Sequence, residues 1–324
     1  MIENTEESPA STAQRVGGKF SYYFRKHFTL IVLFALIIFF KIASPYFFTF
    51  QNFANIGRQT SIVSIIAVGM TLVIITGQID LSVGSLFVLT GIASALVMQN
   101  FGNSWILGAL AAICVGAICG FINGIITVKL KVPSFMVTLG MLGVFRGVAM
   151  LITETRPVLI ANNTYFKVFG ETRFFGLPIA VIWTIAIVWI GAFLLHRTAF
   201  GLRIFSTGGN PQAARYTGVK TGQTIIYSFM ILGALTGLGA LLFTGIAHAA
   251  RPDLGVGLEL DVIAAVILGG VHLFGGRGTV VGAIIGSLII GVINNGLVLI
   301  GVTPSIQLII KGIVIILAVS LSRK

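Results

Sequence analysis

Residues 81–128 read LSVGSLFVLTGIASALVMQNFGNSWILGALAAICVGAICGFINGIITV, and none of these 48 residues is charged. A membrane-spanning helix needs about 20 apolar residues, so this stretch is too long for one helix and suits two. The turn between the two is supplied by Asn100, Gly102, Asn103 and Ser104. The stretch therefore predicts two membrane helices joined by a tight turn.

The composition of the whole chain supports this interpretation. Of the 324 residues, 56% are hydrophobic and 9% are charged, whereas about 25% of the residues of a soluble domain are charged. This excludes an ordinary soluble enzyme and a disordered protein. The net charge of +12 is typical of basic cytoplasmic loops in a membrane protein, so no nucleic acid partner is expected.

Other charge-free runs locate eight further spans and predict an all-α membrane protein with about ten transmembrane helices. The predicted helices cover about residues 28–44, 59–76, two within 81–128, 134–152, 174–195, 221–247, 260–273, and two within 278–320 that divide near Gly301 and Pro304. Residues 1–27 are predicted to be a cytoplasmic N-terminal tail without a cleavable signal, and residues 28–322 the transmembrane domain.

The positive charges test the orientation of these helices. With ten spans and a cytoplasmic N-terminus, thirteen Lys and Arg residues lie inside, five lie outside and three lie within spans, which accounts for all 21. Basic residues accumulate in cytoplasmic loops. We therefore predict that both termini are cytoplasmic.

Two glycine-interrupted segments, TGQIDLSVG at 76–84 and GGVHLFGGRG at 269–278, lie within otherwise apolar stretches. With five helices per half, the second half enters the membrane from the opposite side, which predicts a 5+5 inverted repeat of the kind found in transporters. Close packing of helices through small residues is the alternative explanation.

Several residues in and near these segments are candidates for a translocation path or gate. Asp80 can cap free N–H groups at a helix start, and Arg277 is expected to hold the matching position in the second half. Arg146 lies inside a predicted helix, where a charge is costly unless it is paired or wetted, so both pairing and path lining remain open. The candidates are Asp80, Ser82, Arg146, Gly269, Gly270 and Arg277.

The chain offers little chemistry of its own. It contains no G-x-x-x-x-G-K-[ST] nucleotide-binding motif, and its four histidines are scattered. We expect no catalytic residues, no metal site and no bound cofactor. Because membrane-embedded charges that could couple transport to ions are sparse, energy is expected from another subunit. An ion-coupled secondary transporter and a membrane-embedded enzyme remain as alternatives.

The polar connection between the sixth and seventh predicted helices contains a short, well-capped helix at about 209–219. Asn210 suits the N-cap, Pro211 the first helical position and Gly218 the stop. This segment is either a surface helix without a partner or a docking element for a cytoplasmic protein. The residues assigned to docking are Gly209, Asn210, Pro211, Ala213, Ala214, Arg215 and Gly218.

Three stretches together resemble the membrane permeases of ribose-type monosaccharide ABC importers: residues 67–85, 209–219 and 259–270, the last followed by GGRG at 275–278. The segments VPSFMVTLG at 132–140 and NNGL at 294–297 extend the resemblance, which covers about residues 28–319. The chain departs from the family at His272 and Phe274, where small residues are usual. This departure bears on the identity of the substrate more than on the fold.

The resemblance implies a permease of the bacterial cytoplasmic membrane that forms a homodimeric or heterodimeric pore. It implies two cytoplasmic ATP-binding cassette subunits, which hold ATP and Mg²⁺, and an extracytoplasmic sugar-binding protein. The 209–219 helix would then sit in a groove of the ATPase subunit. A monosaccharide is the expected cargo, and a sugar-like signalling molecule or a polyol is the alternative.

Overall fold

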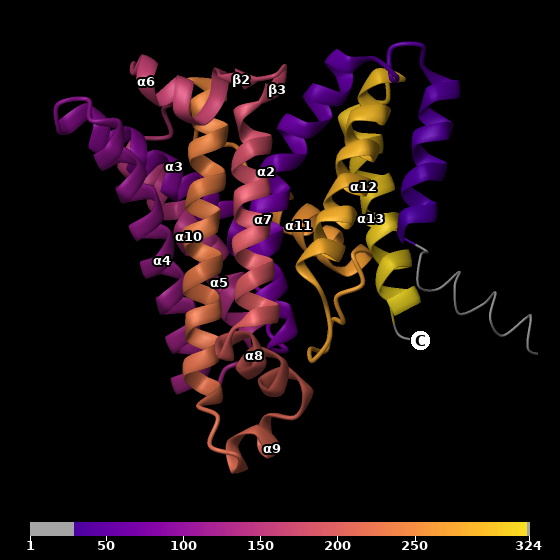
Figure 1. Cartoon of the computed structure of the whole chain (residues 1–324). Helices are drawn as coiled ribbons and strands as arrows, with labels where there is room; N and C mark the ends of the chain where they lie inside the picture. The colour runs from indigo at the N-terminus through magenta and orange to yellow at the C-terminus, as the bar shows by residue number, and fades with distance from the viewer. Residues whose placement is uncertain (1–28, 323–324) are drawn as a thin grey trace, which may run out of the picture.

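A computed structural model describes residues 29–322, and the side chains of residues 29–314 and 316 are placed. The predicted cytoplasmic tail, residues 1–27, lies outside the described residues. The described chain is a bundle of tilted helices (Figure 1). Its apolar helices are Thr29–Ala43, α2 (Phe50–Ile75), α3 (Val83–Asn100), α4 (Trp105–Lys129), α5 (Ser134–Thr153), α7 (Ile179–Arg197), α10 (Thr221–Ala247), α11 (Leu258–Leu268), α12 (Val280–Leu299) and α13 (Pro304–Ser322).

Shorter elements lie at the two ends of the bundle. One end, the hairpin end, carries α6 (Asn163–Phe166), the π-helix η1 (Lys167–Glu171), and the antiparallel hairpin of β2 (Arg173–Phe174) and β3 (Leu177–Pro178). At the same end β1 (Val158–Leu159) pairs with β4 (Ala249–Ala250). The opposite end, the α9 end, carries α8 (Ala199–Gly209) and α9 (Pro211–Tyr216) (Figure 1).

Each predicted span has a helix at its place, but several boundaries differ. Seven described helices are long and apolar enough to cross a membrane. α2 begins at Phe50, nine residues before the predicted start, because the Thr49 side chain accepts a hydrogen bond from Asn52 N and starts the helix there. α7 begins at Ile179 rather than Phe174, because residues 173–178 form the β2–β3 hairpin.

The helix predicted at 260–273 is α11, which has only 11 residues. At a rise of 1.5 Å per residue this helix is about 16 Å long, roughly half of a hydrocarbon core of about 30 Å. The glycines that follow Leu268 end the helix early, since Gly270 has φ +83°. α11 is therefore too short to cross a membrane by itself.

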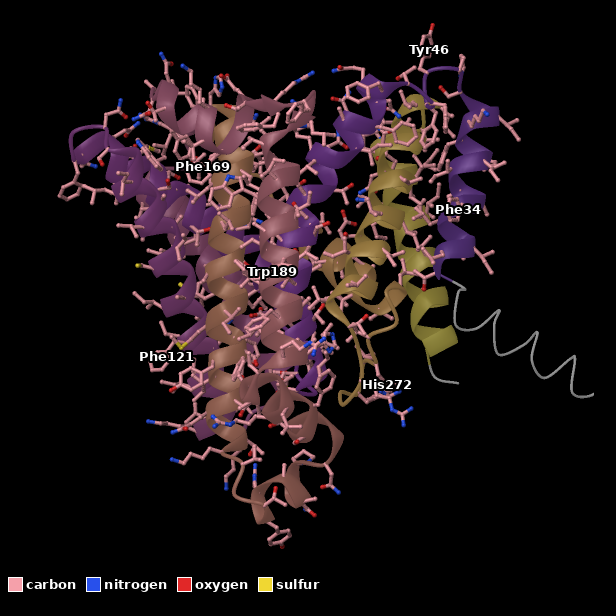
Figure 2. The ribbon with its side chains drawn as sticks, viewed as in Figure 1. Phe34, Tyr46, Phe121, Phe169, Trp189 and His272 are labelled. Carbon is pink, nitrogen blue, oxygen red and sulfur yellow. The ribbon has the colours of Figure 1, made fainter. Side chains whose placement is uncertain are left out.

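The core lies where α2, α3, α4 and α10 meet. Backbones approach closely between α4 and α10, because a Cβ on Gly116 or Gly233 would overlap the carbonyl group of the other residue. The outer surface is apolar. Phe34 and Phe121 project from it (Figure 2), with 61% and 41% of their surface exposed. This surface suits a lipid surround, and the polar residues described next lie near the starts of α3 and α11 and on α4 and α5.

Candidate functional site

Two segments that lie outside the helices and contain turns, called the extended segments below, lead into two helices whose N-terminal ends meet. Residues 76–82 follow α2 and lead into α3, while residues 251–257 follow α10 and β4 and lead into α11. A Cβ on Gly84, near the start of α3, would overlap the Gly255 carbonyl and the Glu259 carboxylate. Glycine is therefore needed at this closest approach. Broken helices of this kind mark the working region of many transporters.

Asp80 is the centre of a buried polar cluster. Its side chain is 1% exposed, and Oδ1 accepts hydrogen bonds from Ser82 N at 2.7 Å and Ser82 Oγ at 2.6 Å. Asn123 Nδ2, from the interior of α4, donates to Asp80 Oδ2 at 3.2 Å and to Ser82 Oγ at 2.9 Å. The structure thus brings together the predicted pair Asp80 and Ser82 and adds Asn123, whose only signal in the sequence is an amide within an apolar run.

The same segment is fixed from its other side by α5. Ile79 N donates to Ser134 Oγ at 3.0 Å, and Leu81 N donates to Thr138 Oγ1 at 3.0 Å. Extended backbone inside a membrane protein requires such partners, because unpaired N–H groups away from water are costly. Residues 76–82 are therefore held between α4 and α5 by side-chain hydrogen bonds.

Arg146 holds the second extended segment. Its Nη1 donates to the carbonyl oxygen of Pro252 at 2.6 Å and also to that of Leu254. Glu259, which sequence reasoning missed, accepts a hydrogen bond from Gly257 N at 3.2 Å through Oε1 and so ties the first turn of α11 to the segment before it. Pairing of Arg146 is thus observed, and its partners are backbone carbonyls on another element.

The remaining predicted path residues lie elsewhere. Gly269 ends α11 against α12, where a Cβ would overlap the carbonyl of Gly282. Arg277 is exposed in the loop between α11 and α12. Within that loop Gly276 N donates to Ile75 O at 2.9 Å.

The last contact corrects the expected symmetry. Segments 76–84 and 269–278 touch each other near the C-terminal end of α2, whereas an inverted repeat places equivalent segments at opposite membrane faces. The prediction that Arg277 matches Asp80 is therefore wrong.

The predicted docking helix forms as α9. Asn210 Oδ1 accepts from Gln212 N at 3.1 Å and from Ala213 N at 3.0 Å, and Pro211 occupies the first turn. Gly218 ends the turn with φ +83°. Ala214, however, is buried against its own chain, so it cannot enter a groove of another protein. Its replacement by Trp would deform the connection itself.

The helix α8, which sequence reasoning did not separate from the connection, leads into α9 and rests on the end of α2. A Cβ on Gly208 would overlap the carbonyl oxygen of Ile75, and it would lie 2.7 Å from Gly276 N. Figure 2 shows His272, in the same loop as Gly276, toward the α9 end of the bundle. The α8–α9 unit is therefore in direct contact with segment 269–278 and with the last residue of α2, directly before segment 76–84.

An ion pair inside the bundle was also missed from the sequence. Lys311 Nζ of α13 lies 2.9 Å from Asp261 Oδ2 of α11, and their side chains are 23% and 13% exposed. Asn294 Nδ2 of α12 donates to the same oxygen at 3.4 Å. This pair ties α11 to α12 and α13. Within residues 29–314, no group of three or more His, Cys, Asp or Glu side chains is placed to hold a metal ion.

Comparison with known proteins agrees with this arrangement. Residues 52–319 match the family described as "Branched-chain amino acid transport system / permease component". The chain belongs to this family. It is 42% identical to the ribose import permease protein of Escherichia coli (strain K12) over 97% of this chain and 99% of that protein.

Two further relatives extend the similarity. The ribose import permease protein of Bacillus subtilis (strain 168) is 42% identical over 90% of this chain and 91% of that protein. The D-allose transport system permease protein of Escherichia coli (strain K12) is 34% identical over 94% of this chain and 93% of that protein. No solved structure gives a significant match to the chain.

Proposed function

We propose that this chain is the membrane-spanning permease subunit of an ATP-driven importer of the bacterial cytoplasmic membrane, and that it conducts a monosaccharide. The observation that carries the proposal is the meeting of two extended segments at Gly84 and Glu259, in a chain similar along almost its whole length to ribose import permeases. Ribose is the first substrate to test, because two relatives named for ribose share 42% identity with the chain.

The proposed topology has ten crossings in a 5+5 inverted arrangement, with both termini at the α9 end in the cytoplasm. α2 followed by 76–82 and α3 has its counterpart in α10 followed by 251–257 and α11. The two extended segments approach the junction from opposite ends of the bundle, as a two-fold axis in the membrane plane requires. Residues 28–322 then form the permease domain, with residues 1–27 as its cytoplasmic tail.

The path is assigned to the face formed by α5 and residues 251–257. Arg146 lies seven residues before the end of α5 at Thr153, which is about 10 Å along the helix. Near it, the side chains of Arg251 and Asp253 are 50% and 58% exposed. Charged side chains in a membrane protein face water-filled cavities or protein rather than lipid. This face therefore suits an aqueous path, which a second permease subunit would complete.

The ATPase subunit is placed at the α9 end. Tyr216 is 92% exposed at the end of α9, and a cavity of about 450 Å³ beside α9 is lined by Lys129, Arg215 and Lys220 together with apolar residues. Arg215 Nε donates to Thr221 Oγ1 at 3.0 Å, which fixes its side chain at this cavity. The three cations suit acidic side chains on the ATPase, and that subunit would hold ATP and Mg²⁺.

Movement of the ATPase would reach the path through backbone contacts. α9 continues from α8, and α8 touches Ile75 and Gly276 at the entrance to both glycine-interrupted segments. An extracytoplasmic sugar-binding protein would deliver the sugar at the hairpin end. We propose a role in coupling for four positions of this connection. Asn210 and Pro211 start α9, Gly218 ends its turn, and Gly208 makes the contact with Ile75 and Gly276.

Uptake by cells tests the proposal. Cells that lack their own sugar permeases would express this chain with or without its ATPase and binding protein, and would receive labelled ribose, allose, a polyol or leucine. ATPase-dependent uptake of a monosaccharide is the expected result. Uptake of leucine, to which the family description also points, or sugar uptake that does not need the ATPase, would overturn it.

A further inference from the structure

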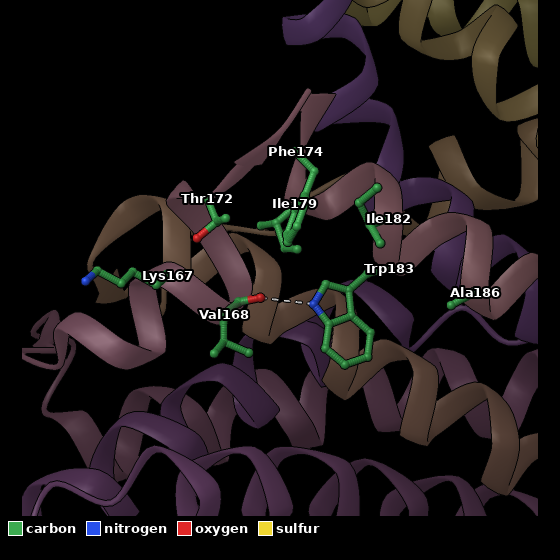
Figure 3. A pocket seen from close by; sticks show the side chains of 8 residues that line it. All are labelled: Lys167, Val168, Thr172, Phe174, Ile179, Ile182, Trp183 and Ala186. Carbon is green, nitrogen blue, oxygen red and sulfur yellow. Dashed lines mark hydrogen bonds between the residues drawn. The ribbon is translucent and has the colours of Figure 1, made fainter. Parts of the chain in front are cut away.

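A groove of about 470 Å³ opens on the surface of α7 near the hairpin end (Figure 3). Its floor is formed by Ile179, Ile182, Trp183 and Ala186, which follow the i, i+3, i+4, i+7 spacing of one helix face. From the first to the last of these residues the floor runs about 10 Å along the helix. The groove thus extends about 10 Å from the hairpin end along a helix that is long and apolar enough to cross a membrane.

The upper wall of the groove comes from η1 and the start of the hairpin. Trp183 Nε1 donates to the carbonyl oxygen of Val168 at 3.0 Å, and the indole ring stacks on Phe169 with centroids 5.8 Å apart. The polar atom of the Trp183 side chain therefore has a hydrogen-bond partner, and the indole ring presents an apolar surface to the groove. Lys167 and Thr172 lie at the rim (Figure 3).

The rest of α7 shows what surrounds this groove. Below it, Ile185 is 59% exposed, Trp189 is 70% exposed and Ile190 is 52% exposed. Exposed apolar side chains along a candidate membrane span face lipid. The groove is therefore continuous with the lipid-facing surface, and an acyl chain can enter it from the side.

One cationic side chain lies at the rim of the groove, and two more line a separate cavity nearby. Lys167 lines the groove itself, and Arg58 and Arg173 line a neighbouring cavity of about 260 Å³. The acidic residue there, Glu171, lies 2.9 Å from Nε2 of His248. Basic side chains between or beside membrane helices attract anionic headgroups.

From the apolar floor, the lipid-facing position and the lysine at the rim, we propose that the groove binds one anionic phospholipid. One acyl chain lies along α7 against Trp183, and the phosphate headgroup lies beside Lys167. The proposal concerns the outside of the bundle, so it stands independently of the transported substrate.

Tryptophan quenching by brominated phospholipids tests this site directly. The chain has three tryptophans, Trp105, Trp183 and Trp189. A W105F/W189F protein reports on the groove, and a W105F/W183F protein reports on the open face of α7 as the matched control. Each full-length protein would be placed in two kinds of vesicle. One kind contains brominated phosphatidylglycerol with unbrominated phosphatidylcholine, and the other contains brominated phosphatidylcholine with unbrominated phosphatidylglycerol.

Quenching of Trp183 should show that the groove prefers the anionic lipid about fivefold over the zwitterionic one, as expected for one lysine near a headgroup. Quenching of Trp189 should show no preference. Lys167→Gln should abolish the selection, while Arg156→Gln, which removes an exposed cation outside the groove, should leave it. Ala186→Phe should reduce quenching of Trp183 by both lipids.

Three results would overturn the proposal. The first is equal quenching of Trp183 by the two lipids, and the second is selection that persists in Lys167→Gln. The third is quenching of Trp189 by the lipids without quenching of Trp183 by either lipid. The groove would then be covered by protein, such as a second copy of the chain.

Discussion

Replacement of Asp80 probes the cluster that holds the first extended segment. Asp80→Ala removes the acceptor of three donors, namely the N–H and O–H of Ser82 and the amide of Asn123. A buried donor left without a partner costs about 1–3 kcal/mol. The hydroxyl can rotate toward another acceptor, so two donors remain unpaired and the expected loss of stability is about 3 kcal/mol.

Asp80→Asn is the matched control. The introduced side-chain amide would keep one oxygen as an acceptor for Ser82 and would turn its N–H₂ group toward Asn123. Asn123 can answer by rotating its own amide, because its Oδ1 has no hydrogen-bond partner among the described residues. The expected cost is therefore only about 1 kcal/mol.

Thermal unfolding in detergent and sugar uptake by vesicles should be measured on the same preparations. Asp80→Ala should lower the Tm by roughly 5–10 °C and should lower uptake more than it lowers the amount of folded protein, while Asp80→Asn should stay close to wild type in both. Equal losses of uptake and of folded protein in Asp80→Ala would show that Asp80 only caps. Identical behaviour of the two variants would refute the hydrogen-bond argument.

Four other predictions follow from the contacts described. Gly218→Val should abolish co-purification with the ATPase while the protein still inserts, because φ is +83° there and a β-branched residue is strained by about 1–3 kcal/mol; normal co-purification would exclude this turn from coupling. Tyr216→Ala should weaken the same association without lowering the Tm, and a lowered Tm would point to a packing role instead. Arg146→Leu should reduce uptake at least tenfold while Arg146→Lys keeps part of it, since two carbonyls lose a charged donor; equal uptake by both variants would contradict this. Asp261→Asn and Lys311→Met should each cost about 3–5 kcal/mol, but the double variant much less, and additive losses would rule out the ion pair as the cause.

The helices were predictable because lipid requires long apolar runs. The span at 221–247 agrees with α10 at both ends, and the turn at Asn100–Ser104 separates α3 from α4 as expected. The predicted helix boundaries were wrong in two situations. In one, a helix continues through a charged residue; in the other, an uncharged stretch does not form helix. α2 continues through Arg58, while the uncharged residues 174–178 belong to a hairpin instead of a helix turn.

The site was only partly predictable, because its contacts join residues far apart in the chain. Glycine content marked 76–84 and 269–278, but only the fold shows that these segments touch each other and that the start of α3 meets 251–257. Asn123 meets Asp80 across 43 positions, and Lys311 meets Asp261 across 50. Local spacing contains no information on such partners. α9, in contrast, depends on adjacent residues and was found from them.

The central claim, that ATP hydrolysis on a partner subunit drives a monosaccharide through this chain, is tested most directly in sealed vesicles. Vesicles would contain the permease and its ATPase, with the sugar-binding protein and labelled ribose outside and ATP or ADP enclosed. The account predicts uptake with ATP, no uptake with ADP, and loss of uptake when the permease carries Gly218→Val. Uptake driven by a proton or sodium gradient in vesicles that lack the ATPase would contradict it.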